Sequence, residues 1–361
     1  MKVLHVITSL SDGGGAEKLM EDVLPMIKAK GVDVSIAVLN DMDTNNKKNL
    51  KAKGINVIKI GSGEKIYSLL KMLKLIPIMK DFDIVHSHLT APFFFCAFGS
   101  LFSKVKLVTT IHNTDMRYRR FASLRKLERW AISRYETIIA CSNEVEASLR
   151  NVLGENLNNL MTISNGVKLD KFFQAIPSSL FKDKRWRLIT MVAMFRPEKD
   201  HKTVICALKY LPKSYHLILV GYGELMEEVK QFAKDSGVEE RTHFLGKRTD
   251  VPNILKASDF IVLSSHHEGL SLASIEGMAA GKPFIASDVP GLRELVKGYG
   301  ILFDEGNSEQ LASIIMRLDN NSMEYVQVAD QCRARASSFD LSKMAEGYLC
   351  VYNQIEREAQ M

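Results

Sequence analysis

Two carboxylates eight positions apart lie in the stretch HHEGLSLASIEGMAAGKPFIASDVPGLREL, residues 266–295. Glu268 precedes an apolar run and Glu276 lies inside it. A carboxylate is a strong acceptor for paired hydroxyl groups, so ribose and sugar diols are natural partners for these two residues. The spacing suits a ligand long enough to need both of them, such as a nucleotide sugar. The alternative is a helix whose early acidic residues are favoured only by its dipole.

The same stretch contains a candidate anion site. It follows the strand pattern FIVLSS, and we expect its helix to begin near Ser271. Glu268 then lies in the loop between strand and helix, and Glu276 lies more than one turn into the helix. The first N–H groups of a helix have no partner inside it, so they can bind a phosphate. The backbone groups that would face this phosphate belong to Gly269, Leu270, Ser271 and Leu272.

Two glycine-rich loops also follow strand patterns. In SLSDGGGAEK, Gly14 and Gly15 let the backbone approach a ligand at the start of a helix. A dinucleotide fingerprint needs a third glycine where Lys18 stands, which disfavours an NAD-dependent enzyme, and a plain tight turn is the alternative. In LVGYGELM, Gly221 and Gly223 repeat the pattern, although a single Gly-x-Gly is weak support on its own.

A basic loop, VAMFRPEKDHKT, follows the first strand pattern of the second half. Arg196, Lys199 and Lys202 lie close together in this loop and could hold a diphosphate, because guanidinium and ammonium groups suit phosphate oxygens. The alternative is that these side chains are only solvated, as surface lysines usually are.

The elements that must position these residues are short apolar runs that alternate with helix-like segments. Such alternation is typical of a parallel sheet covered on both faces. The expected strands of the first half are KVLHVIT, DVSIAVLN, INVIKI, DIVHSHL, KLVTTIH and TIIACS. The pattern restarts after residue 185 with RLITMVAMF, HLILVG, THFLG, FIVLSS and KPFIASD. We therefore predict an α/β fold of two doubly wound domains, with ligands beyond the carboxyl ends of the strands.

The domain boundaries follow from this restart. The turn signal Asn165-Gly166 and the polar stretch PSSLFKDK lie between the two halves. We predict an N-terminal domain over residues 1–167 and a C-terminal domain over residues 168–342. The final helical segment, about 343–361, is expected to pack back on the N-terminal domain.

The composition is that of an ordinary soluble globular protein, with 46% hydrophobic and 25% charged residues in a chain of 361. The net charge of +6 is modest and points to no nucleic acid. Five scattered cysteines without a Cys-x-x-Cys motif favour a reduced compartment and no structural metal. The start MKVLHVIT is too short for a signal peptide, and LTAPFFFCAFGSLF falls short of the ~20 residues that span a bilayer. We expect a cytoplasmic protein.

Several motifs occur together along nearly the whole chain: GGAE, TTIHN, ACSNEV, ISNGVKLDKF, PEKDH, LVGYGEL, FLGKRTDV and the stretch with Glu268 and Glu276. With these motifs the sequence resembles the retaining GT-B glycosyltransferases of family 4, also called group 1. The resemblance implies two Rossmann-like domains that face a central cleft. It also implies that the N-terminal domain binds the acceptor and that the C-terminal domain binds the nucleotide sugar.

The resemblance further implies roles for individual residues. Glu268 is expected to contact hydroxyls of the donor sugar, and Glu276 those of the ribose. Lys199 is expected to neutralise the diphosphate, and His112 matches the histidine near the transferred sugar. The catalytic residues implied in this way are His112, Lys199 and Glu268. The glycine loop, with Gly14 and Gly15, is expected to approach the donor.

One departure from the family concerns the basic loop. The family usually carries an arginine five residues before the lysine that matches Lys199, and here Met194 occupies that position. Arg196 is expected to supply the missing charge. The implied mechanism is transfer with retention by front-face departure of the nucleoside diphosphate, whose developing charge the basic loop and a helix N-terminus would stabilise.

No metal or other cofactor is expected, and the nucleotide-sugar donor is a co-substrate. Two Asp-x-Asp triplets could in principle chelate a divalent ion that holds a diphosphate. DFD at 81–83 precedes its strand instead of following it. DMD at 41–43 is followed by a polar run that is typical of an ordinary loop. We therefore expect neither triplet to bind a metal ion.

Residues of the first half are candidates for the acceptor side. His86 and His88 end the pattern DIVHSHL; one could be a packed core histidine, and His88 is expected nearer the acceptor. The segment 116–134 holds seven basic residues, including Arg117, and 65–80 carries four lysines with apolar residues at helical spacing. Basic amphipathic helices can lie on an anionic membrane. The alternative for each segment is a core helix with a solvated face.

Taken with the resemblance, these observations predict a metal-independent, retaining glycosyltransferase of hexosyltransferase type. We expect a UDP-linked donor and a glycan or polyprenyl-diphosphate-linked acceptor in bacterial surface polysaccharide synthesis, with the protein peripheral at the inner face of the cell membrane. One rival is a nucleotide-sugar epimerase on the same scaffold. The other is a catalytically silent GT-B binding protein, against which the intact His112, Lys199, Glu268 and Glu276 argue.

Overall fold

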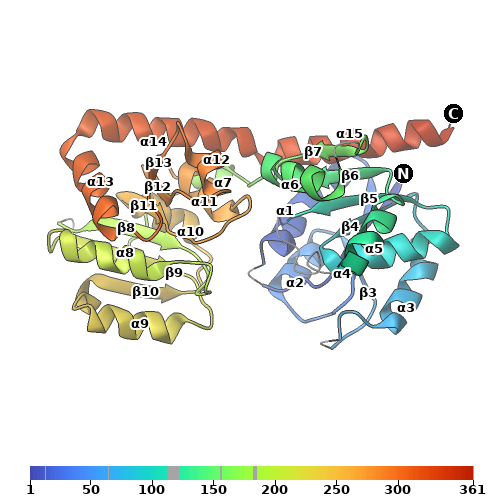
Figure 1. The fold of residues 1–361 in the computed structure, drawn as a ribbon, viewed down its shortest axis with the longest axis horizontal. Coiled ribbons are helices and arrows are strands. Elements are labelled where there is room, and N and C mark those ends of the chain that lie inside the picture. The colour runs from blue at the N-terminus through green and yellow to red at the C-terminus, as the bar shows by residue number, and fades with distance from the viewer. Residues whose placement is uncertain (13, 64, 113–121, 155–156, 182–184, 361) are drawn as a thin grey trace. The chain divides into compact units, whose positions relative to one another are not determined.

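The computed structural model describes residues 1–12, 14–63, 65–112, 122–154, 157–181 and 185–360 (Figure 1). The chain divides into two compact units. Unit 1 consists of Met1–Gly166 and Leu341–Met361, and unit 2 consists of Val167–Asp340. The last helix of the chain thus belongs to the same unit as the first strand.

Unit 1 contains a seven-stranded parallel sheet in the order β3-β2-β1-β4-β5-β6-β7. Its strands are β1 (Lys2–Ile7), β2 (Asp33–Val38), β3 (Asn56–Lys59), β4 (Ile84–His88), β5 (Lys106–Ile111), β6 (Thr137–Ala140) and β7 (Leu160–Thr162). Its helices are α1 (Gly15–Ala29), α2 (Asn45–Ala52), α3 (Leu69–Met79), α4 (Thr90–Gly99), η1 (Ser100–Phe102), α5 (Ala122–Ile132), α6 (Asn143–Leu153) and α15 (Leu341–Gln360).

Alternate residues of β1 enter two different hydrophobic cores, because successive side chains of a strand point to opposite faces. Val3 and Ile7 belong to the core that α1 and α15 cover. Leu4 and Val6 belong to the core that α3, α4, α5 and α6 cover. The polar residue between them, His5, therefore points to the face covered by α15, which places it among the residues described below.

Unit 2 contains a six-stranded parallel sheet in the order β10-β9-β8-β11-β12-β13. Its strands are β8 (Arg187–Val192), β9 (Tyr215–Val220), β10 (Thr242–Gly246), β11 (Phe260–Leu263), β12 (Phe284–Ser287) and β13 (Ile301–Phe303). Its helices are α7 (Asp170–Phe173), α8 (His201–Ala207), η3 (Leu208–Tyr210), α9 (Met226–Asp235), η4 (Glu239–Arg241), α10 (Val251–Ala257), α11 (Leu272–Ala279), α12 (Leu292–Val296), α13 (Ser308–Asn320), α14 (Ser322–Ala336) and η5 (Ser337–Phe339).

The prediction of two doubly wound α/β domains is confirmed, and each expected apolar run forms a strand. Two strands were not expected, β7 and β13, each of three residues at one edge of its sheet. Their length explains the omission, since three residues carry no usable periodicity. None of the described helices combines the length with the apolar character that crossing a bilayer requires. All five cysteines are free thiols.

Candidate functional site

The loops after β8 and β11, neighbouring strands of unit 2, bring Lys199 and Glu268 together. The Lys199 ammonium donates to Glu268 Oε1, and Ser265 Oγ donates to the same oxygen at 2.8 Å. The Glu268 side chain is 9% exposed and that of Lys199 is 20% exposed, so water screens the pair only partly. The sequence placed both residues at the carboxyl ends of strands, and the structure shows them in direct contact.

Backbone hydrogen bonds hold these two loops against each other. Lys199 and Ser265 form an antiparallel bridge, and the N–H of His266 donates to the carbonyl of Glu198 at 2.9 Å. Asp200 then caps α8, because its carboxylate accepts from the Thr203 N–H at 3.0 Å. The position of the Lys199 side chain is therefore set by backbone pairing and a helix cap as well as by its ion pair.

Helix α11 begins at Leu272, with Ser271 as its N-cap residue, close to the expected start. The Ser271 side chain makes no capping bond, so the first N–H groups of the helix keep their capacity to bind an anion. Glu276 lies on α11, more than one turn in, with a partly exposed side chain. Glu268 and Glu276 therefore flank the N-terminus of α11 in the arrangement that the sequence predicted.

Gly291 supports the Glu268 loop, although sequence reasoning gave this residue no role. A Cβ atom at Gly291 would lie 2.4 Å from the carbonyl oxygen of Glu268 and 2.5 Å from that of Gly269. Both are backbone atoms, which cannot yield as a flexible side chain can. The chain after β12 thus packs directly on the loop that carries Glu268. The only signal in the sequence was the turn residues of DVPG.

The basic side chains near Lys199 do not all face the same way. Arg196 is exposed, and Met194 is partly buried. Lys202 donates to Glu228 Oε1 at 2.6 Å, and its ammonium lies 5.5 Å from the centre of the Phe232 ring. Lys202 thus pairs with a carboxylate on α9, and its share in holding a diphosphate stays a prediction.

Gly221 and Gly223 connect the loop after β9 to the loop that carries Lys199. Both have positive φ, 150° and 158°. A Cβ atom at Gly221 would lie 1.9 Å from the Ala193 carbonyl oxygen, and one at Gly223 would lie 2.3 Å from that of Phe195. The backbone also pairs here, because Phe195 N–H donates to the Tyr222 carbonyl at 3.0 Å. These glycines allow two loops to pack backbone against backbone.

We expect Gly221→Ala to destabilise the protein more than Gly237→Ala does. Gly237 also has positive φ, 69°, but a Cβ atom there would meet nothing within 4 Å. The control therefore carries only the cost of a left-handed conformation, ~1–2 kcal/mol. The overlap with Ala193 should add ~1–3 kcal/mol. Urea unfolding of both variants measures the difference, and equal losses would contradict the close packing of these loops.

In unit 1 the glycine loop contains a carboxylate of its own. Gly14 is the N-cap of α1, and a Cβ atom at this position would overlap Glu17 Oε2. Ser11 Oγ donates to Glu17 Oε1 at 3.1 Å. Gly15 is the first residue of the helix and is exposed. An acidic side chain thus occupies part of the helix N-terminus that the sequence offered to a ligand, and an anion would have to displace it or bind beside it.

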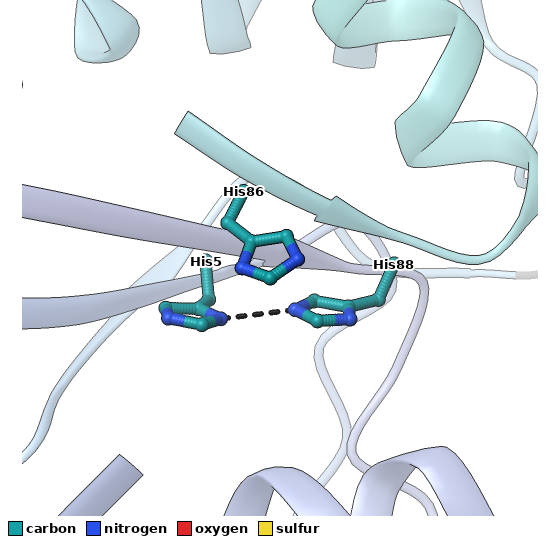
Figure 2. Close-up of side chains that lie close together, drawn as sticks. All are labelled: His5, His86 and His88. Carbon is teal, nitrogen blue, oxygen red and sulfur yellow. Dashed lines mark hydrogen bonds between the residues drawn. The ribbon is translucent and has the colours of Figure 1, made fainter. Parts of the chain in front are cut away.

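Four histidines of unit 1 lie in contact: His5 in the middle of β1, His86 and His88 on β4, and His112 directly after β5. His88 Nδ1 lies 3.3 Å from His112 Nε2, and His88 Nε2 lies 2.9 Å from His5 Nδ1. Figure 2 shows the rings of His5 and His88 joined by that hydrogen bond, with His86 beside them. His86 and His88 are both fully buried, whereas His112 is partly exposed. Sequence reasoning missed His5, whose place in the middle of an apolar strand gave no signal.

Burial keeps these rings neutral at pH 7. It lowers the pKa of His5 to about 3 and that of His112 to about 4. It also holds the pKa of His86 and of His88 well below the usual value, and the neighbouring histidines add to this effect. The structure therefore places His88 directly beside His112, as two uncharged imidazoles.

Other residues of interest in the sequence lie outside this cluster. Asp41 pairs with Lys47 at 2.5 Å, and Asp43 pairs with Lys48 at 3.0 Å. The Asp83 carboxylate accepts from the Lys2 N–H at 2.6 Å. Arg117, predicted on the acceptor side, lies outside the described residues.

Two family models match consecutive parts of the chain. Glycosyltransferase Family 4 matches residues 13–171, and Glycosyl transferases group 1 matches residues 172–337. An Escherichia coli UDP-Gal:alpha-D-GlcNAc-diphosphoundecaprenol alpha-1,3-galactosyltransferase is 28% identical over 311 residues, covering 81% of this chain and 79% of that protein. A Bacillus anthracis N-acetyl-alpha-D-glucosaminyl L-malate synthase is 25% identical over 292 residues, 77% of this chain and 76% of that one.

Solved structures match the fold along nearly the whole chain. The crystal structure of Anabaena HepE in complex with UDP and glucose has a TM-score of 0.84 at 22% identity, covering 98% of this chain and 99% of that one. A sucrose-phosphate synthase from Thermosynechococcus elongatus has a TM-score of 0.82 at 17% identity, covering 99% of this chain and 100% of that one. With its two Rossmann-like parallel sheets and both family matches, the chain belongs to the group 1, family 4 glycosyltransferases of the GT-B fold.

Proposed function

We propose that the protein is a retaining glycosyltransferase that takes its sugar from a nucleotide sugar, most simply a UDP-linked one. The observation that carries this proposal is the contact of Lys199 with Glu268 beside the N-terminus of α11. A cation, a hydroxyl acceptor and the start of a helix without a side-chain cap lie together there. They match the diphosphate and the sugar hydroxyls of one ligand.

Each group then has a role in the proposed reaction. Lys199, with Arg196 on the same loop, neutralises the diphosphate as negative charge grows on the departing nucleotide. Glu268 accepts hydrogen bonds from hydroxyls of the transferred sugar, and Glu276 accepts them from the ribose. We assign His112 to the transferred sugar, on the strength of the family resemblance.

The proposed transfer retains the configuration at the anomeric carbon and needs no metal ion. The nucleoside diphosphate leaves from the face at which the acceptor hydroxyl attacks, and its departing phosphate oxygen takes the hydroxyl proton. No carboxylate has to become a covalent nucleophile. The charges needed to stabilise the leaving group are supplied by Lys199 and by the start of α11. The protein carries no other cofactor in this proposal.

The acceptor we propose is a glycan or a polyprenyl-diphosphate-linked sugar in bacterial surface polysaccharide synthesis. Two relatives support this choice by their names. The Escherichia coli relative acts on a GlcNAc-diphosphoundecaprenol, and a Campylobacter jejuni relative, 25% identical over 226 residues, is an N,N'-diacetylbacillosaminyl-diphospho-undecaprenol alpha-1,3-N-acetylgalactosaminyltransferase. Such a reaction would take place at the cytoplasmic face of the membrane.

A thermal-shift screen across nucleotide sugars tests the donor. A ligand at 100 times its dissociation constant stabilises the folded state by ~2.7 kcal/mol, so the preferred donor should raise the melting temperature above all others. The same donor, with an undecaprenyl-diphosphate-linked sugar, should give a product of retained anomeric configuration by NMR, at an undiminished rate in EDTA. Inversion, or loss of activity with EDTA, would contradict the mechanism.

Two rival functions give different results in that assay. A nucleotide-sugar epimerase would convert the donor without any acceptor and without releasing nucleotide. A catalytically silent binding protein would show the thermal shift but no turnover with any acceptor. The proposed transferase releases UDP in proportion to the glycoside it forms.

We also propose that unit 1 docks on an anionic membrane through a patch on α3 and η1. The exposed apolar residues there are Tyr67, Leu69, Leu70, Leu73, Leu101 and Phe102. The C-terminal end of α3 lies next to the start of η1, since a Cβ atom at Gly99 would lie 2.6 Å from Met79 Sδ. Exposed lysines accompany the patch: Lys65, Lys74, Lys80 and Lys104. Lys71 is buried instead and donates to the Gly63 carbonyl at 3.1 Å, so the segment 65–80 presents fewer charges than its sequence suggested.

We expect sedimentation with phosphatidylglycerol vesicles at low salt, weakening as salt rises. Each lysine near an anionic surface contributes ~1 kcal/mol, and this attraction is screened beyond ~8 Å at physiological salt. Changing Leu69, Leu70 and Leu73 to serine should weaken vesicle binding tenfold or more. Tenfold corresponds to about the free energy of burying one leucine side chain, so the estimate is a lower bound for three. Met323→Ser with Val326→Ser, exposed residues of unit 2, is the control.

The triple variant should keep its activity on a short soluble acceptor, because the patch lies outside the proposed site. A wild-type protein that stays in the supernatant at low salt would show that the α3 patch does not bind membranes. The glycosyltransferase proposal would stand in that case.

A further inference from the structure

A continuous chain of hydrogen bonds crosses the interior of unit 1 from β5, through α15, to His112. Its six members are Thr110, His86, Tyr352, His5, His88 and His112. We call it the histidine–tyrosine chain. The first five members are almost completely buried, and only His112 is partly exposed.

Strand register explains why the rings meet. His5 on β1 is the register partner of His86 on β4, and the two strands are parallel neighbours. His88 lies two residues further along β4, so it shares the same face of the sheet. Figure 2 shows the three side chains projecting to one side of the strands. That face is covered by α15, whose Tyr352 reaches both His86 and His5.

Each imidazole in the chain is neutral, because burial disfavours the charged form. A neutral imidazole has one N–H and one acceptor nitrogen. A histidine with hydrogen bonds at both nitrogens must therefore donate through one and accept through the other. The direction of hydrogen-bond donation at one end of the chain therefore fixes the direction of every other bond, including the one to His112.

The two contacts of the Tyr352 hydroxyl indicate which direction this is. The distance to His86 Nδ1 is 2.6 Å, and the distance to His5 Nε2 is 3.2 Å. Bonds donated by O–H are shorter than bonds donated by N–H. Tyr352 thus donates to His86 Nδ1 and accepts from the Nε2–H of His5.

The remaining tautomers follow from that assignment. His86 donates through Nε2 to Thr110 Oγ1 at 2.8 Å. His5 Nδ1 must accept from His88 Nε2–H, and His88 Nδ1 must accept from His112 Nε2–H. His112 is therefore left with Nδ1 as its acceptor nitrogen.

We infer that Tyr352 is a positioning residue that fixes His112 as the Nε2–H tautomer. His112 then presents a lone pair at Nδ1, which accepts a hydrogen bond from a hydroxyl of the bound sugar and cannot donate one to a phosphate. The role of the tautomer in catalysis rests on the proposed function, which places the sugar at His112. The tautomer itself is a property of the free protein.

A metal ion is the competing explanation for this cluster. One ring nitrogen from each of His5, His86 and His88 lies within 4.8 Å of the others, a geometry that could hold a metal ion. The hydrogen bonds argue against it, because both nitrogens of all three rings already have partners in the chain. A metal ion would have to break several of these bonds in a fully buried site.

Nitrogen-15 NMR of histidine side chains in the whole protein, without donor, tests the inference, with His112 assigned through His112→Gln. We expect an N–H at Nε2 and an unprotonated Nδ1 for His112. Tyr352→Phe removes the group that sets the direction and should produce a measurable population with Nδ1–H. Tyr348→Phe is the matched control, since this buried tyrosine, one turn earlier on α15, contacts Thr110 at the far end and leaves the other bonds intact.

Thr110→Val provides a second variant should Tyr352→Phe fail to fold. It removes the acceptor of the His86 Nε2–H, so it too should raise the Nδ1–H population of His112. An Nδ1–H tautomer in the wild type, or no change in the folded Tyr352 and Thr110 variants, would overturn the inference. The inference would also be overturned if adding one equivalent of Zn²⁺ shifted the signals of His5, His86 and His88 together.

Kinetics then connect the tautomer to the reaction. Tyr352→Phe should lower kcat roughly fivefold or more, the size of one lost neutral hydrogen bond, with KM for the donor unchanged. An unchanged kcat alongside a shifted tautomer would show that the sugar does not use Nδ1. If the wild type transfers no sugar at all, the proposed function fails, while the spectra still decide the tautomer.

Discussion

Replacing Lys199 by alanine is expected to lower kcat by about 10²–10³, with a much smaller loss of donor affinity. The charge on the diphosphate grows as the glycosidic bond breaks, so an ammonium beside it stabilises the transition state more than the bound donor. Lys199 is suited to this role because its loop is held by backbone pairing with Ser265 and by the Asp200 cap. Initial rates together with calorimetric donor binding separate the two effects.

Two neighbouring basic residues complete the measurement. Lys202→Ala removes an exposed lysine three positions away that pairs with Glu228, and such a pair is worth ~1 kcal/mol or less, so kcat should change by less than about fivefold. Arg196→Ala should resemble Lys199→Ala if Arg196 replaces the arginine that the family carries at Met194. A wild-type rate in Arg196→Ala would show that the missing charge is not replaced.

A structural defect must be separated from the loss of the charge. Without Lys199, the nearly buried Glu268 carboxylate still accepts from Ser265 but loses its cationic partner. Burying the unpaired charge lowers the stability of the folded protein. The double variant Lys199→Ala with Glu268→Gln removes this unpaired charge. It should regain thermal stability, which would show that the stability loss of Lys199→Ala comes from the unpaired carboxylate. A folded Lys199→Ala enzyme with normal kcat would exclude the proposed role.

The fold could be predicted from the sequence because its strands are buried on both faces. Runs such as HLILVG and FIVLSS have no polar alternation, as strands of a covered parallel sheet require. The strand order could not be predicted in the same way. The contact of Lys199 with Glu268, 69 positions apart, depends on β8 and β11 being neighbours, which no local pattern encodes. Sequence reasoning placed both residues after strands, and only the sheet brings them together.

The histidine cluster shows the same limit more sharply. His86 and His88 were visible as polar residues at a strand end, where ligand sites are expected. His5 lies in the middle of β1 and acquires its partners only through the β1–β4 register and the packing of α15. Tyr352 on α15, which binds His86 in the same cluster, is 266 positions away from that residue in the sequence. Lys202 is the opposite case. Its spacing predicts a shared role with Lys199, and the structure adds an exposed pair with Glu228 on α9 that no local pattern indicated.

Glu276→Ala is expected to weaken UDP binding tenfold or more. A carboxylate that accepts hydrogen bonds from both ribose hydroxyls contributes ~1.5–3 kcal/mol for each bond, and every ~1.4 kcal/mol is a factor of ten in Kd. Glu276 lies more than one turn into α11, on the helix whose first N–H groups would bind the phosphate. Glu240→Ala, which removes an exposed carboxylate of the same unit in η4, should leave UDP affinity unchanged.

The same variant can be tested against the ligand hydroxyls themselves. Calorimetry with UDP and with 2′-deoxy-UDP, on the wild type and on Glu276→Ala, forms a double-mutant cycle between the carboxylate and one hydroxyl. If they are bonded, deleting the 2′-hydroxyl costs affinity in the wild type and almost nothing in the variant, because its partner is already gone. Glu276→Gln keeps one acceptor oxygen without the charge and should fall between the two. Parallel losses in the wild type and in Glu276→Ala would show that this carboxylate does not touch the 2′-hydroxyl, and unchanged UDP affinity would exclude it from the nucleotide site.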